Sequence, residues 1–145
     1  GDVRLSSQEI PACYFTRNFS DVRSYLGEGN WRAEQQPPGP PWGQTQPPRK
    51  AMAMFTSNGQ GVAVFSPSST QRWNFGPHGE GDSDEPTAGP CMHVAPIDRV
   101  RLGYDSTYRY RYWLVVGNEK DIALRLDALW NQYSSESAQL LPPRP

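Results

Sequence analysis

The clearest pattern of hydrophobic positions lies in the middle of the chain, where two short apolar segments flank a turn. Residues 50–56 and 61–66 are rich in apolar side chains, and Asn58-Gly59 between them tolerates the positive φ of a tight hairpin turn. Small alanines adjoin methionine and phenylalanine there, which predicts close packing against a second layer. Gly61 leaves room for a β-bulge. This part of the chain therefore predicts a β-hairpin.

Further short apolar segments predict strands on both sides of this hairpin. One of these segments ends near residue 15, and the others cover residues 21–26, 70–76, 91–103 and 107–117. The last of them, "TYRYRYWLVVG", places three tyrosines on one side of a strand and Arg109, Arg111 and Trp113 on the other. Because this segment leads directly into a helix, we predict a central strand whose tyrosine side faces the core.

A single helix is predicted near the C-terminal end. Asn118 is a good N-cap, and apolar residues recur at steps of three and four from Ile122 to Tyr133. The fold class predicted from these elements is mainly β, an antiparallel β-sandwich with one C-terminal α-helix. We expect one domain over residues 1–145, whether the chain is complete or a portion of a longer one.

Two segments lack the period of a strand or a helix. Residues 27–49 are rich in proline, and the tryptophans Trp31 and Trp42 in them predict an ordered loop that packs on the domain surface. Residues 76–90 are rich in glycine and acidic residues, and they predict a solvated loop.

Composition and charge exclude some classes of partner. The net charge of −1 removes the main argument for nucleic-acid binding. The sequence also contains no run of 18 apolar residues, so it does not predict a membrane span. Cys13 and Cys91 allow one disulfide or two buried thiols. The possible disulfide, together with an Asn-Phe-Ser glycosylation pattern at Asn18, predicts a secreted or extracytoplasmic protein.

Four stretches of the chain carry a resemblance to a known type of module: "QEIPACY" (8–14), "AMAMFTSNGQGVAVFSP" (51–67), "HVAP" (93–96) and "YRYRYWLVVGNEKDI" (108–122). Their order resembles the β-sandwich modules of secreted carbohydrate-active proteins, which are similar to portions of the large sandwich of aldose mutarotases and polysaccharide-processing enzymes. The resemblance covers about half of the chain and implies the fold rather than an activity. No position here matches the catalytic His and Glu pair of a mutarotase.

An acid–base site needs ionisable side chains close to apolar segments, where burial shifts their pKa values. Glu9 and His93 fit this description and are the candidate catalytic residues, with Asp98 and Tyr14 as further candidates. The alternative is structural: Glu9 binds a turn and His93 is a hydrogen-bonded core residue. Whether the protein is an enzyme is left open.

Metal binding is the weaker hypothesis. No cofactor is expected, although Asp82, Asp84 and Glu85 have the oxygen ligands that calcium prefers. Their spacing does not follow an EF-hand, and a solvated acidic loop is the commoner explanation.

Aromatic and arginine side chains offer a carbohydrate-binding chemistry. Sugar rings stack on tryptophan, and arginine pairs with carboxylates, which would suit an acidic polysaccharide. The candidate substrate-binding residues are Trp31, Trp42, Trp73, Arg109, Arg111 and Trp113.

The leading hypothesis for function is therefore a carbohydrate-interacting β-sandwich module, as a binding domain or as part of a carbohydrate-active enzyme. The alternative is a structural or assembly protein that self-associates or contacts other chains through exposed aromatic residues and strand edges. RNA binding on an aromatic sheet is opposed by the charge balance.

Overall fold

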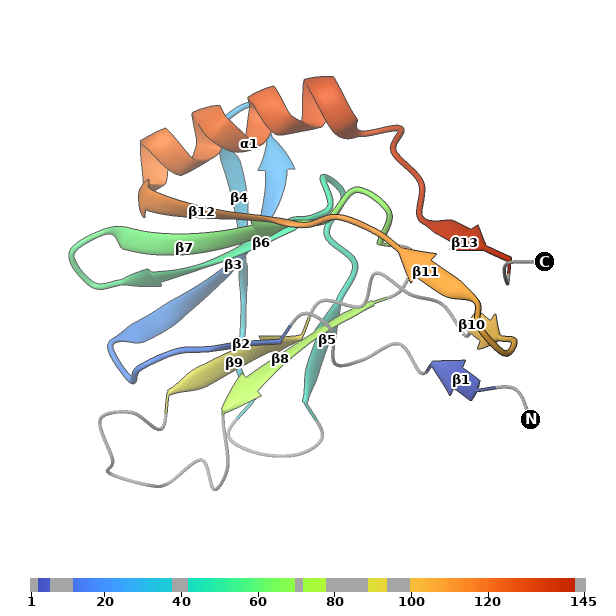
Figure 1. Cartoon of the computed structure of the whole chain (residues 1–145). Helices are drawn as coiled ribbons and strands as arrows, with labels where there is room; N and C mark the ends of the chain where they lie inside the picture. The colour runs from blue at the N-terminus through green and yellow to red at the C-terminus, as the bar shows by residue number, and fades with distance from the viewer. Residues whose placement is uncertain are drawn as a thin grey trace.

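The protein was described from a computed structural model, which covers residues 3–5, 12–37, 42–69, 72–77, 89–93 and 100–142. Within these ranges the chain forms two antiparallel sheets, two further strand pairs and one α-helix (Figure 1). The fold is therefore mainly β and sandwich-like, as the sequence predicts.

The larger sheet has five strands in the order β12-β7-β6-β3-β4, and every neighbouring pair is antiparallel. Its strands are β3 (Phe19–Gly27), β4 (Asn30–Glu34), β6 (Ala51–Thr56), β7 (Gln60–Phe65) and β12 (Trp113–Asn118). The predicted central hairpin is confirmed as β6 and β7. Both strands lie inside the sheet and carry packing layers on both faces.

The smaller sheet has four strands in the order β2-β9-β8-β5 and covers one face of the larger one (Figure 1). Its strands are β2 (Ala12–Tyr14), β5 (Gly43–Thr45), β8 (Trp73–Pro77) and β9 (Pro90–His93). Between the sheets, Met52, Met54 and Val64 pack against Trp73, Phe75 and Met92. Large side chains fill this layer of the core.

Helix α1 (Glu119–Tyr133) covers the opposite face of the larger sheet. There Ala51, Ala53 and Ala63 lie under the helix residues Ile122 and Leu126. Side chains alternate along a strand, so the small residues of β6 and β7 all face the helix and the large methionines and valines face the other sheet. This alternation lets the helix approach the backbone of the sheet closely.

The helix begins and ends as the sequence predicts. The Asn118 side chain accepts a hydrogen bond from the Asp121 N–H at 2.8 Å, and Glu119 and Asp121 in the first turn complement the helix dipole. The residue after the helix, Ser134, closes the last turn through its N–H on the Trp130 carbonyl at 3.0 Å. Among the described segments there is no helix of the length and apolarity that a membrane span requires.

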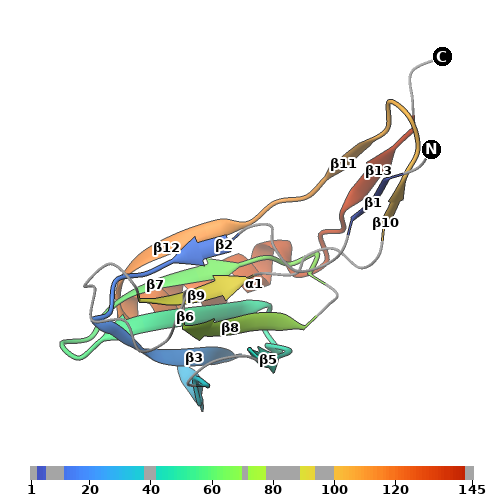
Figure 2. The same ribbon diagram turned by 90° about the horizontal axis from the view of Figure 1, so that it is seen from below.

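Two strand pairs lie beyond the sandwich. β1 (Val3–Leu5) pairs with β10 (Val100–Leu102), and β11 (Thr107–Arg109) pairs with β13 (Gln139–Leu141). Figure 2 shows these four strands together as an arm that projects from the two large sheets, beside both ends of the chain.

The prediction of one central strand over residues 107–117 is wrong. The segment divides into β11, which belongs to the arm, and β12, which is an edge strand of the larger sheet. The tyrosines are not core residues either: Tyr108 and Tyr110 are half-buried beside each other and Tyr112 is exposed. Tyrosine alternates with arginine over residues 108–112, and this pattern gives no sign that the chain passes from one sheet to another there.

The predicted loop over residues 27–49 contains two strands, β4 and β5. A turn at Gly27–Gly29, in which all three residues have positive φ, returns the chain so that Trp31 pairs with Tyr25. Of the predicted acidic loop at 76–90, residues 78–88 lie outside the described residues. The predicted strand at 91–103 is represented by β9 and β10, with 94–99 between them also outside that range.

The structure contains no disulfide: Cys13 and Cys91 are both free thiols. Cys13 lies opposite Met92 in the β2–β9 ladder, whereas Cys91 lies opposite Tyr14. Because residues directly opposite each other share a face, the two thiols point to opposite faces of the sheet and cannot meet. Burial raises the pKa of both thiols.

Gly61 tests the close approach of helix and sheet. The register through Gly61 is regular, so no bulge forms there; a Cβ at this position would lie 2.4 Å from the Phe55 ring and 3.2 Å from the Ile122 side chain. We predict that Gly61→Ala lowers the free energy of unfolding by about 1–3 kcal/mol in urea denaturation. Gly103→Ala, where nothing lies within 4 Å, is the matched control. Equal stability of the two variants would contradict this packing.

Candidate functional site

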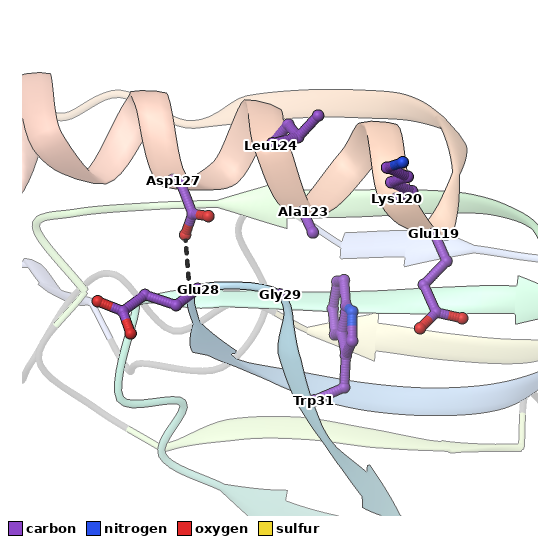
Figure 3. Close-up of a pocket in the computed structure, with 8 residues that line it drawn as sticks. All are labelled: Glu28, Gly29, Trp31, Glu119, Lys120, Ala123, Leu124 and Asp127. Carbon is purple, nitrogen blue, oxygen red and sulfur yellow. Dashed lines mark hydrogen bonds between the residues drawn. The ribbon is translucent and has the colours of Figure 1, made fainter.

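A cavity with a volume of about 730 Å³ lies between the β3–β4 turn and the first half of α1 (Figure 3). Two elements far apart in the sequence form it. Its lining residues are Glu28, Gly29, Trp31, Glu119, Lys120, Ala123, Leu124 and Asp127. We refer to it below as the Trp31 cavity.

A hydrogen-bonded tether between the turn and the helix fixes one end of the cavity. The Tyr25 hydroxyl donates to Asp127 Oδ1 at 2.6 Å and accepts from the Gly29 N–H at 2.9 Å. The Glu28 N–H donates to the same Asp127 oxygen at 3.1 Å. These three hydrogen bonds hold the positive-φ turn against α1.

The Trp31 indole stands in the cavity (Figure 3), and two other aromatic residues lie against it. Its ring lies edge-on to Phe55, at 5.4 Å between centroids, and tilted against Tyr25 at 4.7 Å. Its Nε1–H is buried and has no acceptor among the described residues. An unpaired buried donor costs free energy, so an acceptor atom supplied there would be stabilising.

The acidic residues around the cavity differ in whether they form an ion pair within the described part of the chain. Glu119 pairs with Arg23 at 2.9 Å, and Arg23 also pairs with Asp21 at 2.6 Å; the Asp21 hydrogen bond, more than that of Glu119, raises the pKa of Arg23. The carboxylate of Glu28 has no ion pair in the described part of the chain, and its side chain is exposed. Lys120 is exposed at the end of the cavity near Glu119.

The arginine and tryptophan residues predicted in 107–117 lie away from this cavity. Arg111 donates to the Glu136 carboxylate through two nitrogens and stacks on Trp113 at 4.7 Å and Tyr133 at 4.8 Å. The Glu136 hydrogen bond raises the pKa of Arg111. Its guanidinium is therefore engaged within the protein. Arg109 is exposed and lines, with Arg111, a smaller hollow of about 280 Å³.

The other two predicted tryptophans occupy different layers. Trp73 is fully buried between the sheets and donates to Ser69 Oγ at 2.5 Å, which excludes it as a stacking surface for a ligand. Trp42 is 36% exposed and covers Gly76 on the outer face of the smaller sheet. The predicted tryptophans therefore do not converge on one cleft, and Trp31 is the only tryptophan among the residues that line the Trp31 cavity.

The predicted catalytic and metal-binding residues are only partly placed. Glu9 and Asp98 lie outside the described residues, as do Asp82, Asp84 and Glu85 of the calcium hypothesis. The backbone of His93 lies in β9, between Ala12 and Asn74 of the smaller sheet, whereas the Trp31 cavity is on the helix side of the larger sheet. Within the described segments no cluster of three or more metal-ligating side chains occurs.

The sequence analysis identified Trp31 but missed its polar neighbours. Asp127 lies one turn after Ala123 on the same side of the helix, where an acidic residue interrupts the apolar stripe. The Gly-Glu-Gly-Asn run at 27–30 is a turn signal immediately before Trp31. Only the packing of α1 against the larger sheet brings these two signals together.

Comparison of the chain with protein-family models, with curated proteins and with solved structures found no match. The assignment of class therefore rests on the fold alone: a mainly β, sandwich-like protein whose larger sheet is covered by one helix.

The tether predicts a pH dependence. Burial raises the pKa of Tyr25 to about 12 and the hydrogen bond to Asp127 acts in the same direction, whereas a tyrosine in the unfolded chain titrates near 10. The protonated phenol thus favours the folded state below pH 10, and this contribution is lost between about pH 10 and pH 12. Its size is on the order of 2 kcal/mol.

We predict that Tyr25→Phe is less stable than the wild type at neutral pH by about 1–2 kcal/mol, because Gly29 N–H loses its acceptor. The difference in free energy of unfolding between the two proteins should shrink as the pH rises from 10 to 12. Chemical denaturation at successive pH values measures it. Other groups that titrate in this range are common to both proteins, so an unchanged difference would contradict the raised pKa of Tyr25.

Proposed function

We propose that the protein is a carbohydrate-interacting β-sandwich module and that its ligand binds in the Trp31 cavity. The observation that carries the proposal is the Trp31 ring facing Ala123 of the helix, in a cavity that Leu124, three carboxylates and a lysine also line. Sugar rings present C–H faces that stack on indole and hydroxyl groups that bind carboxylate, ammonium and N–H groups. The volume of about 730 Å³ is within the usual range for ligand sites.

One feature supports binding as the core of the proposal: the tryptophans do not meet the backbone of His93 in one cleft. The resemblance of residues 51–67 and 108–122 to modules of carbohydrate-active proteins agrees with a glycan ligand. A secreted or extracytoplasmic location belongs to the same proposal.

Filling the cavity should abolish binding. Leu124 is exposed and lines the cavity, so Leu124→Arg places a long side chain there without disturbing the core. On a panel of neutral and charged oligosaccharides, we expect the wild type to bind at least one member and Leu124→Arg to bind it at least about tenfold more weakly, a loss of about 1.4 kcal/mol. Isothermal titration calorimetry measures both.

Leu140→Arg is the matched control, because Leu140 is also exposed but lies on β13 in the arm. It should bind as the wild type does. The proposal fails if the wild type binds no oligosaccharide, or if Leu124→Arg binds as tightly as Leu140→Arg.

A second candidate function is assembly through the edge strand β12. Leu114 and Val116 are 57% and 76% exposed, and in the described part of the chain β12 has a strand neighbour on one side only, β7. A hollow of about 510 Å³ lies beside them, between β12 and α1. An apolar edge strand without a charged side chain is a template for pairing with another chain.

Assembly of this kind should depend on the apolar edge. We predict concentration-dependent association of the wild type in light scattering and a monomeric Val116→Lys variant, because lysine blocks edge pairing. Leu124→Lys changes an equally exposed residue away from β12 and should associate as the wild type does. A wild type that is monomeric at every concentration would remove this candidate.

A further inference from the structure

The Trp31 cavity is lined by more acidic than basic side chains. Glu28, Glu119 and Asp127 line it, and Lys120 is the lining residue with a positive charge. Two arginines lie near this surface. Arg23 pairs with Asp21 and Glu119, and Arg49 packs against Gly27 of the turn and stacks on the Trp130 ring at 4.9 Å.

Asp127 presents one oriented oxygen that is not used by the fold. Both of its hydrogen bonds, from the Tyr25 hydroxyl and the Glu28 N–H, reach Oδ1. Oδ2 receives no hydrogen bond from the described residues, and Figure 3 shows it on the side of the carboxylate that faces along the cavity toward Trp31. A fixed carboxylate oxygen of this kind is a strong acceptor for a charged donor.

The two ends of the cavity differ in charge. Lys120 and the Arg23-paired Glu119 lie at one end, whereas Asp127 and Glu28, without ion pairs in the described segments, lie at the other (Figure 3). A ligand carboxylate at the Asp127 end would meet like charge, which costs free energy. The arginines that would attract an acidic polysaccharide, Arg109 and Arg111, line a different hollow.

We propose that the Trp31 cavity selects a glycan with a protonated amine, whose ammonium group binds Asp127 Oδ2 while its ring lies against Trp31. This inference rests on the proposed carbohydrate-binding function and names the substrate class of the same site. It replaces the expectation of an acidic polysaccharide, because the carboxylates that line the Trp31 cavity outnumber its one lysine and would repel an anionic ligand.

The test compares ligands that differ in the amine alone. An oligomer of β-1,4-linked glucosamine and its fully N-acetylated counterpart share one backbone, and acetylation removes the charge. We expect the wild type to bind the glucosamine oligomer about tenfold more tightly, because only its ammonium group can donate a charge-assisted hydrogen bond to the Asp127 carboxylate. Oligogalacturonate, which is acidic, should bind the most weakly.

Asp127→Asn tests the assigned atom. The asparagine carbonyl can still accept both bonds made by Oδ1, so the tether remains, but the charge and the free carboxylate oxygen are lost. We expect the preference for glucosamine to disappear in this variant. Asp105→Asn makes the same change in the turn between β10 and β11 and should keep the preference. Circular dichroism melting confirms that each variant is folded.

The outcomes separate the two proposals. Equal or tighter binding of the N-acetylated or acidic oligomer to the wild type overturns the amine preference but leaves carbohydrate binding standing; this comparison needs no variant. Tight binding of free spermidine also overturns it, because the amine alone would then account for the affinity. Failure of every oligosaccharide to bind overturns the proposed function and this inference together.

Discussion

The structure depends on a sheet that is buried on both faces by different sets of side chains. β6 and β7 place alanines and Gly61 toward α1 and methionines and valines toward the smaller sheet. Sheets pack about 10 Å apart and large side chains fill that space. On the other face Gly61 and the alanines leave room for the Phe55 ring and for Ile122 of the helix. The position of α1, and with it the cavity at Trp31, depends on this packing.

The close helix then makes a second, polar constraint possible. Only because α1 lies near β3 can Asp127 accept the Tyr25 hydroxyl at 2.6 Å and the Glu28 N–H at 3.1 Å. A buried phenol without a partner would destabilise the core, and a turn of three residues with positive φ is costly without support. Core packing and site geometry are therefore linked through one carboxylate: Asp127 accepts both hydrogen bonds with one oxygen, and its other oxygen receives none from the described residues.

The sequence predicted the elements whose signals are local. The β6–β7 hairpin has its turn pair between two apolar segments, and α1 has its N-cap and apolar stripe within one continuous stretch. The prediction of one strand over residues 107–117 was wrong for the opposite reason. Tyrosine and arginine continue to alternate through residue 112, although the chain passes there from one sheet to another. Arg111, between β11 and β12, is held at that crossing by Glu136 and Tyr133, which follow 25 and 22 residues later. No local pattern contains such a contact.

The candidate site shows the same limit in its chemistry. Arginine and tryptophan at alternate strand positions indicate an anionic ligand when each side chain is taken as available, but availability depends on partners from elsewhere in the fold. Arg111 is already paired with Glu136 and stacked on Trp113, and Trp73 is enclosed by two sheets. Trp31 stands in a cavity because a turn and a helix approach it from distant parts of the chain. The residue types were visible in the sequence, whereas the sign of the charge around the Trp31 ring was decided by tertiary structure.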